Sequence, residues 1–361
     1  MPRISIMAAR YRDNLPSVTD IERRLFAHLA RLRGWRGSGG PEAPSDGDED
    51  IHVWQLCLPR SDKIRIHRRA RALHDRAEAA TGLAHLSTAT RARLAVLRDG
   101  ADLVTIPTEH RADEIAAALH ADMPWMAPAT ETVWHAMRRS VREGDPGLRL
   151  SPLLLVGPPG IGKSHWARAL GSLVGAPTTI VDATSEPAGF AIVGSQVGWA
   201  SAGPGRVLET ILAHRVANPL IVIDEVEKAG SVGSKSGTAH DLAQALLPLL
   251  ERSTAAAWSC PYFRVRIDMC WIGWVLTANT TAGLSAPLLS RCPPLHLSGP
   301  TRQHLKDFAV RQACTHGLPD EATAAILSLL ERTPDGAALS LRTIQRCVSR
   351  AKAALAMPML H

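Results

Sequence analysis

Long hydrophobic runs, aromatic residues and paired cysteines are all scarce in this 361-residue chain. No stretch approaches the run of about 18 apolar residues that a membrane-spanning helix needs, so no membrane partner is predicted. The first ten residues lack the apolar segment and cleavage site of a secretory signal, and secretion is not expected. The six cysteines include no C-x-x-C pair, which argues against structural zinc and favours a reducing, cytoplasmic location.

What the chain does contain is enough apolar material for sizeable cores. Hydrophobic residues make up 45% of the sequence, and the length allows two or three compact units. The net charge is +7 and the pI is near 9.4, which permits acidic partners without naming one.

Residues 1–120 form a region rich in arginine and alanine with helical patterns. Within it, residues 37–50 are Gly/Ser/Pro-rich and acidic, which predicts a flexible linker. Residues 59–98 carry a net charge of +7, equal to that of the whole chain. They form either an exposed helical pair with solvated arginines or a nucleic-acid surface. Because this stretch has no Phe, Tyr or Trp to stack on bases, the first interpretation is favoured.

Residues 121–298 alternate short apolar runs with amphipathic stretches, the pattern of a parallel sheet covered by helices on both faces. The predicted fold class is α/β, with a doubly wound parallel sheet. The runs that predict buried strands are residues 153–156, 178–181, 220–223, 271–276 and 295–297.

Residues 299–361 predict a small helical lid after the α/β core. One helix starts at Pro300-Thr301 and ends near Gly317, and a second runs from Asp320 to about Arg332. Ser340 is the expected N-cap of a third. Its apolar positions recur every three or four residues and share one face: Leu341, Ile344, Val348, Ala351 and Leu355.

The most informative motif follows the first predicted strand of the core. It reads Gly157-Pro158-Pro159-Gly160-Ile161-Gly162-Lys163-Ser164 and precedes a predicted helix over 164–174. Glycines let the backbone approach an anion, and a helix N-terminus attracts negative charge. Lys163 is placed to reach the β- and γ-phosphates of ATP, and Ser164 to bind Mg²⁺.

A second motif ends the strand at 220–223 with Asp224 and Glu225. Asp224 is expected to hold the magnesium, and Glu225 to activate the attacking water as a general base. Together the two motifs predict an enzyme that hydrolyses ATP.

The chain resembles the AAA+ ATPases, and among them the ATPase module of the Lon protease family, over roughly residues 121–357. The segments that carry this resemblance are GPPGIGKS at 157–164, NPLIVIDEVEK at 218–228, LTAN at 276–279, APLLSRC at 286–292 and HLSGPT at 296–301.

The resemblance implies roles for three further residues. Asn279 is similar to the sensor-1 residue that orients the attacking water. Arg291 resembles the arginine finger that completes a neighbouring subunit's site. Arg342 resembles the sensor-2 arginine of the lid, with Arg346 one turn away as the alternative. A finger acting in trans implies a ring oligomer, a hexamer by resemblance.

Lon proteins carry an aromatic pore loop where this chain has Trp199, followed by a turn similar to Pro204-Gly205-Arg206. Ala200 and Ser201 depart from the family's hydrophobic and glycine residues, which leaves threading and clamping of a polypeptide both open. Lon enzymes also continue into a Ser/Lys protease domain. Because this sequence stops soon after its last predicted helix and has no G-x-S-x-G motif, no peptidase activity is expected.

Trp125 and Met126 lie where related ATPases line the adenine pocket, and they are either base contacts or packing residues. The sequence thus predicts a ring motor that remodels or unfolds proteins, with recognition by residues 1–120. The alternatives are a nucleic-acid-associated ATPase that uses residues 59–98, and a regulatory switch that binds ATP and assembles but does little work. The identity of the substrate, and whether an external protease is recruited, are left open.

Overall fold

The structure of the chain is a computed structural model. It describes residues 1–12, 14–33, 58–184, 188–196, 202–229, 242–333 and 340–355. The predicted linker at 37–50 lies outside these ranges. The chain divides into two compact units, one made of residues 1–6 and 99–361 and the other of residues 7–98. No helix within the described ranges combines the length and the apolar character needed to cross a bilayer.

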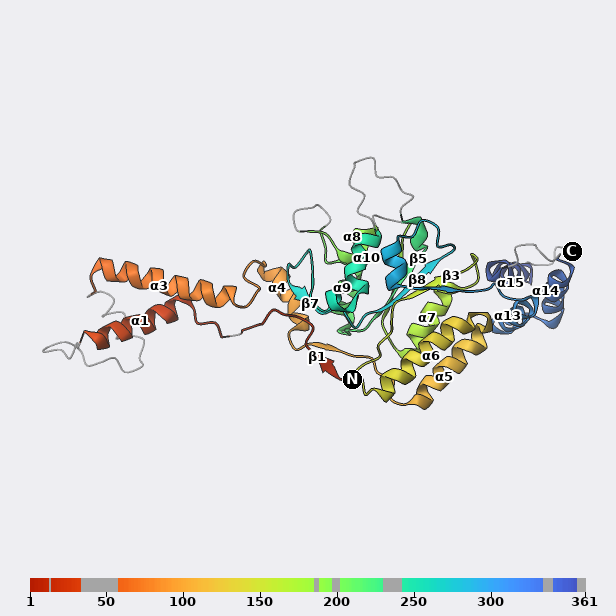
Figure 1. The fold of residues 1–361 in the computed structure, drawn as a ribbon, viewed down its shortest axis with the longest axis horizontal. Helices are drawn as coiled ribbons and strands as arrows, with labels where there is room; N and C mark the ends of the chain where they lie inside the picture. Colours follow the sequence, from red (N-terminus) through yellow and green to blue (C-terminus); the bar gives the residue numbers. More distant parts are fainter. Residues whose placement is uncertain are drawn as a thin grey trace, which may run out of the picture. The chain divides into compact units, whose positions relative to one another are not determined.

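The unit of residues 7–98 is helical. Its described helices are α1 (Val18–Leu32), α3 (Arg60–Ala79), α4 (Thr88–Leu94) and the 3₁₀ turn η1 (Ala95–Leu97). Ser17 caps α1 by accepting from the Asp20 amide at 3.1 Å, while Asp20 accepts from the Ser17 amide. α1 packs against α3 (Figure 1), and each helix buries an isoleucine, Ile21 and Ile66. The helix that pairs with α3 is therefore α1, which precedes residues 59–98. Within residues 59–98, α4 is only a short second helix.

The larger unit contains a five-stranded parallel sheet in the order β4-β5-β8-β3-β9 (Figure 1). The strands are β3 (Leu153–Val156), β4 (Thr178–Asp182), β5 (Leu220–Asp224), β8 (Gly273–Ala278) and β9 (Pro294–His296). The predicted doubly wound α/β class is thus confirmed. β8 begins two residues later than predicted, because Trp271 lies before the strand and stacks under the Arg149 guanidinium, 4.0 Å from the ring centre.

The sheet is buried on both faces. Leu153 and Leu155 pack into a core with α5 (Glu109–Asp122), η2 (Pro124–Met126), α6 (Ala127–Arg142) and α7 (Lys163–Val174). Leu154, between them, points to the other side and is also fully buried. The opposite side carries α8 (Ala188–Val193), α9 (Gly205–His214) and α10 (Leu242–Leu250) (Figure 1).

Short elements complete the core. They are the antiparallel pairs β1 (Arg3–Ile4) with β2 (Ala101–Asp102) and β6 (Trp258–Ser259) with β7 (Arg266–Ile267), together with η3 (Val226–Lys228), α11 (Arg252–Ala255) and α12 (Ala286–Arg291). The compact unit includes residues 99–120, which the sequence analysis grouped with the N-terminal region. The proposed boundaries at residues 120 and 298 stay predictions.

The C-terminal helices are α13 (Arg302–Thr315), α14 (Asp320–Arg332) and α15 (Leu341–Leu355), close to the predicted spans. Thr301 caps α13 by accepting from the His304 amide at 3.2 Å. On α15, Leu341, Ile344 and Val348 are buried, whereas Leu355 is 57% exposed. The predicted apolar face of this helix is therefore buried only over its first turns, because the described lid does not reach Leu355.

Candidate functional site

The phosphate-binding motif forms the loop between β3 and α7. Gly160 and Gly162 have φ values of 77° and 93°, a left-handed conformation that side chains with a Cβ rarely adopt. The loop is tied to two neighbours. The Trp125 indole N–H donates to the Ile161 carbonyl at 2.8 Å, and the Gly160 carbonyl accepts from the Leu341 amide at 3.3 Å. Trp125 is therefore a buried support of the loop.

Lys163 is nearly buried, with 8% of its surface exposed. Its ammonium donates to the carbonyls of Gly157 at 2.7 Å and Pro158 at 3.0 Å and to Asn279 Oδ1 at 3.1 Å. Burial lowers the pKa of Lys163 below its usual 10.5, against the opposing effect of nearby carboxylates, of which Glu227 is the strongest. Two loop carbonyls and the Asn279 side chain thus hold the ammonium at the pocket.

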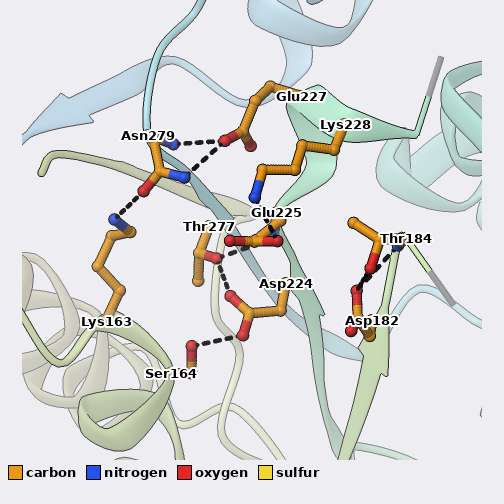
Figure 2. Close-up of polar contacts among 10 residues, drawn as sticks. All are labelled: Lys163, Ser164, Asp182, Thr184, Asp224, Glu225, Glu227, Lys228, Thr277 and Asn279. Carbon is orange, nitrogen blue, oxygen red and sulfur yellow. Dashed lines mark hydrogen bonds and ion pairs between the residues drawn. The ribbon is translucent and has the colours of Figure 1, made fainter. Parts of the chain in front are cut away.

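Ser164, at the start of α7, contacts Asp224, at the carboxyl end of β5. The Ser164 hydroxyl donates to Asp224 Oδ2 at 2.8 Å, and the Thr277 hydroxyl donates to Asp224 Oδ1 (Figure 2). Thr277 is fully buried on β8 and also accepts from the Glu225 amide at 3.2 Å. This threonine orients both acidic residues, and the sequence analysis missed it. The only indication of Thr277 in the sequence was its place two residues before Asn279, directly after the strand predicted at 271–276.

Glu225 follows β5 in a left-handed conformation, with a φ of 56°. Its carboxylate forms an ion pair with Lys228, at 2.7 Å between Oε2 and Nζ, and this contact raises the pKa of Lys228 (Figure 2).

The neighbouring strand β4 ends at Asp182, whose carboxylate accepts from the Thr184 amide at 2.8 Å and from the Thr184 hydroxyl at 2.7 Å (Figure 2). Asp182 is thus engaged in a local turn.

Asn279 lies just beyond β8, between Lys163 and Glu227. Its backbone N–H and side-chain Nδ2 both donate to Glu227 Oε1 at 2.9 Å, while its Oδ1 accepts from Lys163 (Figure 2). Glu227 was not singled out from the sequence, since its place in the 3₁₀ turn η3 gives no indication that it faces residue 279.

These residues surround a cavity of about 340 Å³ between the core and the lid. Its walls include loop residues 159–160 and 162–164, the acidic pair, Asn279 and, from the lid, Phe308, Gln312 and Arg342. Arg346, the alternative to Arg342, is not among the lining residues, and neither are Trp125 and Met126. Asp122 and Met123 line the cavity instead.

Arg291 lies at the end of α12 and does not line this cavity. Its Nη1 donates to the Pro287 carbonyl at 3.2 Å, and its Nε is 3.5 Å from Glu251 Oε2. The predicted pore residue Trp199 and its neighbours Ala200 and Ser201 lie outside the described residues.

The arrangement of the loop, the acidic pair and Asn279 agrees with the protein family that the chain matches. Residues 153–297 match the "ATPase family associated with various cellular activities (AAA)". This range begins with β3 and ends just after β9, so it contains the whole parallel sheet, the phosphate-binding loop, the acidic pair and Asn279.

Similar curated proteins are Lon proteases. The chain is 34% identical to the Lon protease of Magnetococcus marinus over 171 residues, which are 47% of this chain and 20% of that protein. It is 27% identical to the peroxisomal Lon protease homolog 2 of Arabidopsis thaliana over 226 residues, 60% of this chain and 25% of that one. It is 35% identical to the mitochondrial Lon protease homolog of Neurospora crassa over 156 residues, which are 41% of this chain and 13% of that protein. The matches thus span a quarter or less of each relative's length.

Proposed function

Residues 153–297 are the AAA domain of a Lon-like AAA+ ATPase, and on this basis we propose that the chain is a ring motor that uses ATP hydrolysis to remodel or unfold proteins. The observation that carries the proposal is the convergence of Lys163, Ser164, Asp224, Glu225 and Asn279 on one cavity. That the substrate is a protein is inferred only from the similarity to Lon proteases.

In the proposed reaction, residues 157–164 wrap the phosphates and Lys163 exchanges its carbonyl partners for phosphate oxygens. Ser164 and Asp224 are already joined at 2.8 Å, and this hydroxyl–carboxylate pair suits Mg²⁺, which is bound through few protein ligands plus phosphates. When bound, the metal would neutralise negative charge on the phosphates. Asp224 is kept in place for this role by Thr277.

Glu225 is the proposed general base, and Asn279 orients the water. The Glu225 carboxylate is paired with Lys228 at 2.7 Å.

Arg342 already lines the cavity and is proposed to contact the nucleotide in its own subunit. Arg291 does not line it, which agrees with action on a neighbouring subunit's site. This division of labour supports a closed ring, for which we propose six subunits. Residues 1–361 contain no G-x-S-x-G motif, and we propose that they carry no peptidase activity. A cytoplasmic location stays a prediction from cysteine usage.

The decisive experiment uses Glu225→Gln. Loss of the base is expected to stop turnover while ATP stays bound, which traps a nucleotide-loaded assembly that size-exclusion chromatography with light scattering detects. The trapped form also serves to capture protein partners. A Glu225→Gln protein that neither retains ATP nor assembles contradicts hydrolysis at this site and favours the regulatory switch.

The motor activity itself is tested through Trp199, the proposed polypeptide-gripping residue. In Trp199→Ala, stimulation of ATP turnover by an unfolded protein is expected to disappear while basal turnover is kept. Trp199→Phe, which retains a large ring, is the matched control and should keep the stimulation. Equal stimulation of the Ala variant and the native chain contradicts threading.

Nucleic-acid association is the second candidate, because the solvent side of α3 is rich in guanidinium groups. Arg65, Arg68, Arg69 and Arg71 are exposed and form no ion pair with the residues that the structure describes. Phosphate contacts release counterions, so binding of duplex or single-stranded DNA should weaken steeply with salt, by a slope of about 0.7–0.9 per contact. Arg68→Glu should reduce that slope. Absent or salt-independent binding removes this candidate.

A further inference from the structure

We propose that Glu227 is a positioning residue of the ATPase site, which holds the Asn279 amide so that its carbonyl oxygen, and not its nitrogen, faces the attacking water. The inference rests on the proposed hydrolysis at this site and adds a residue to it. Glu227 does not line the cavity, and its positioning role is exerted through its hydrogen bonds to Asn279.

The contacts determine the orientation of the amide. On one side is Glu227 Oε1, which lies 2.9 Å from Asn279 Nδ2 and, as a carboxylate oxygen, only accepts. On the other is the Lys163 ammonium, which lies 3.1 Å from Asn279 Oδ1 and only donates. Rotating the amide by half a turn would place oxygen against oxygen and nitrogen against ammonium. Only the observed orientation satisfies both neighbours.

Glu227 also holds the backbone at this point. Its Oε1 accepts from the Asn279 N–H at 2.9 Å, so one oxygen anchors both the main chain and the side chain just beyond β8 (Figure 2). This fixes the distance of the amide from the sheet edge that carries Asp224 and Glu225. When Lys163 turns to phosphate, Asn279 Oδ1 is released as an acceptor aimed into the cavity, where it can accept a hydrogen bond from the attacking water while Glu225 takes the proton.

The two oxygens of Glu227 differ in their contacts. Oε1 accepts both Asn279 hydrogen bonds, whereas Oε2 is buried and has no hydrogen-bond partner among the described residues. A buried polar atom without a partner lowers stability, so part of this carboxylate costs folding energy while the other part holds Asn279. The charge also helps to keep Lys163 protonated against burial.

The test compares steady-state ATP turnover and nucleotide affinity in the full-length chain. Glu227→Ala frees the amide to rotate, and kcat is expected to fall about tenfold to a hundredfold. The Kd for a fluorescent ATP analogue should change less than about twofold, because the phosphate loop is untouched. Glu227→Gln retains an acceptor for Asn279 and should stay within about threefold of the native kcat. Glu131→Ala, which removes a carboxylate 68% exposed on α6, is the control and should leave turnover unchanged.

A double-mutant cycle separates positioning from a merely structural role. If Glu227 acts through Asn279, the Glu227→Ala/Asn279→Ala protein turns over as slowly as Asn279→Ala alone. The proposal is overturned if the two losses multiply, if Glu227→Ala keeps the native kcat, if its ATP affinity falls in proportion to kcat, or if Glu227→Gln is as slow as Glu227→Ala. A native chain that hydrolyses no ATP would instead refute the proposed function.

Discussion

At the scale of single residues, the site is a set of polar groups that bond to one another. Lys163 is held by the Gly157 and Pro158 carbonyls and by Asn279, and the Glu225 carboxylate is paired with Lys228. In the proposed reaction, Lys163 exchanges its carbonyl partners for phosphate oxygens.

The first prediction concerns the proton on Lys163. Burial lowers its pKa in the nucleotide-free protein, and bound phosphates should raise it again. At pH values between these two pKa values, ATP binding should take up a proton, and affinity should fall as pH rises through the lower of them. Calorimetry in buffers of different ionisation enthalpy measures the uptake. Titrations at pH values below both pKa values, where no uptake is expected, are the control.

The sign for stability follows from the same shift. Because the pKa of Lys163 is lowered on folding, the charged form costs stability at neutral pH, and that cost is relieved as pH rises through the folded value towards 10.5. Proton uptake that is equal below and between the two pKa values would contradict the argument.

At the scale of secondary structure, loop and lid are joined by main-chain contacts. The carbonyl of Gly160, which lines the cavity, accepts from the Leu341 amide at the start of α15. Buried Leu341 and Ile344 anchor this end of the helix in the core shared with α7 and the sheet. We therefore expect any change of the loop on nucleotide binding to reach the N-terminal turns of α15 first.

The second prediction uses the two ends of α15. Ile344 is fully buried, so Ile344→Ala should lower the free energy of unfolding by about 2–5 kcal/mol. Leu355 is 57% exposed, and Leu355→Ala should change it by less than about 0.5 kcal/mol. Chemical denaturation of both variants measures the difference. Equal losses would mean that the lid buries the two ends alike in solution, for example through contacts between subunits.

At the scale of the whole molecule, the cavity of one chain lacks the proposed arginine finger. The cavity contains the phosphate loop, the acidic pair, Asn279 and Arg342, but not Arg291. Arg291 sits on α12 with the Pro287 carbonyl and Glu251 as its neighbours. If it stabilises transition-state charge, it does so for another subunit, and ATP turnover depends on assembly.

The third prediction is complementation between two inactive variants. Arg291→Ala alone should lose about 10³-fold or more in kcat, and Glu225→Gln should be inactive as well. In co-assembled mixtures, an Arg291→Ala subunit can receive Arg291 from a Glu225→Gln neighbour. With random equal mixing roughly a quarter of the sites are complete, if they act independently. Turnover of the mixture is compared with each variant alone. A mixture no more active than its components would place Arg291 outside a neighbour's site.

Much of the core was accessible from the sequence because its signals are local. Apolar runs bounded by turn residues predicted the five strands, and the spacing of glycines, Lys163 and Ser164 predicted a phosphate loop between a strand and a helix. The start of β8 was misplaced because Trp271 is apolar like a strand residue but stacks on Arg149 outside the sheet. Hydrophobicity alone does not separate these two uses of a tryptophan.

The sequence by itself was enough to predict an α/β core with a phosphate loop, an acidic strand end and a helical lid. Only the tertiary structure decided which distant residues surround them: Thr277 donates to Asp224, and Glu227 accepts from Asn279. The reason is topological. β5 and β8 are neighbours in the sheet although about fifty residues separate Glu227 from Asn279. Parallel pairing brings their carboxyl ends together, and contacts made there leave no periodicity in the sequence.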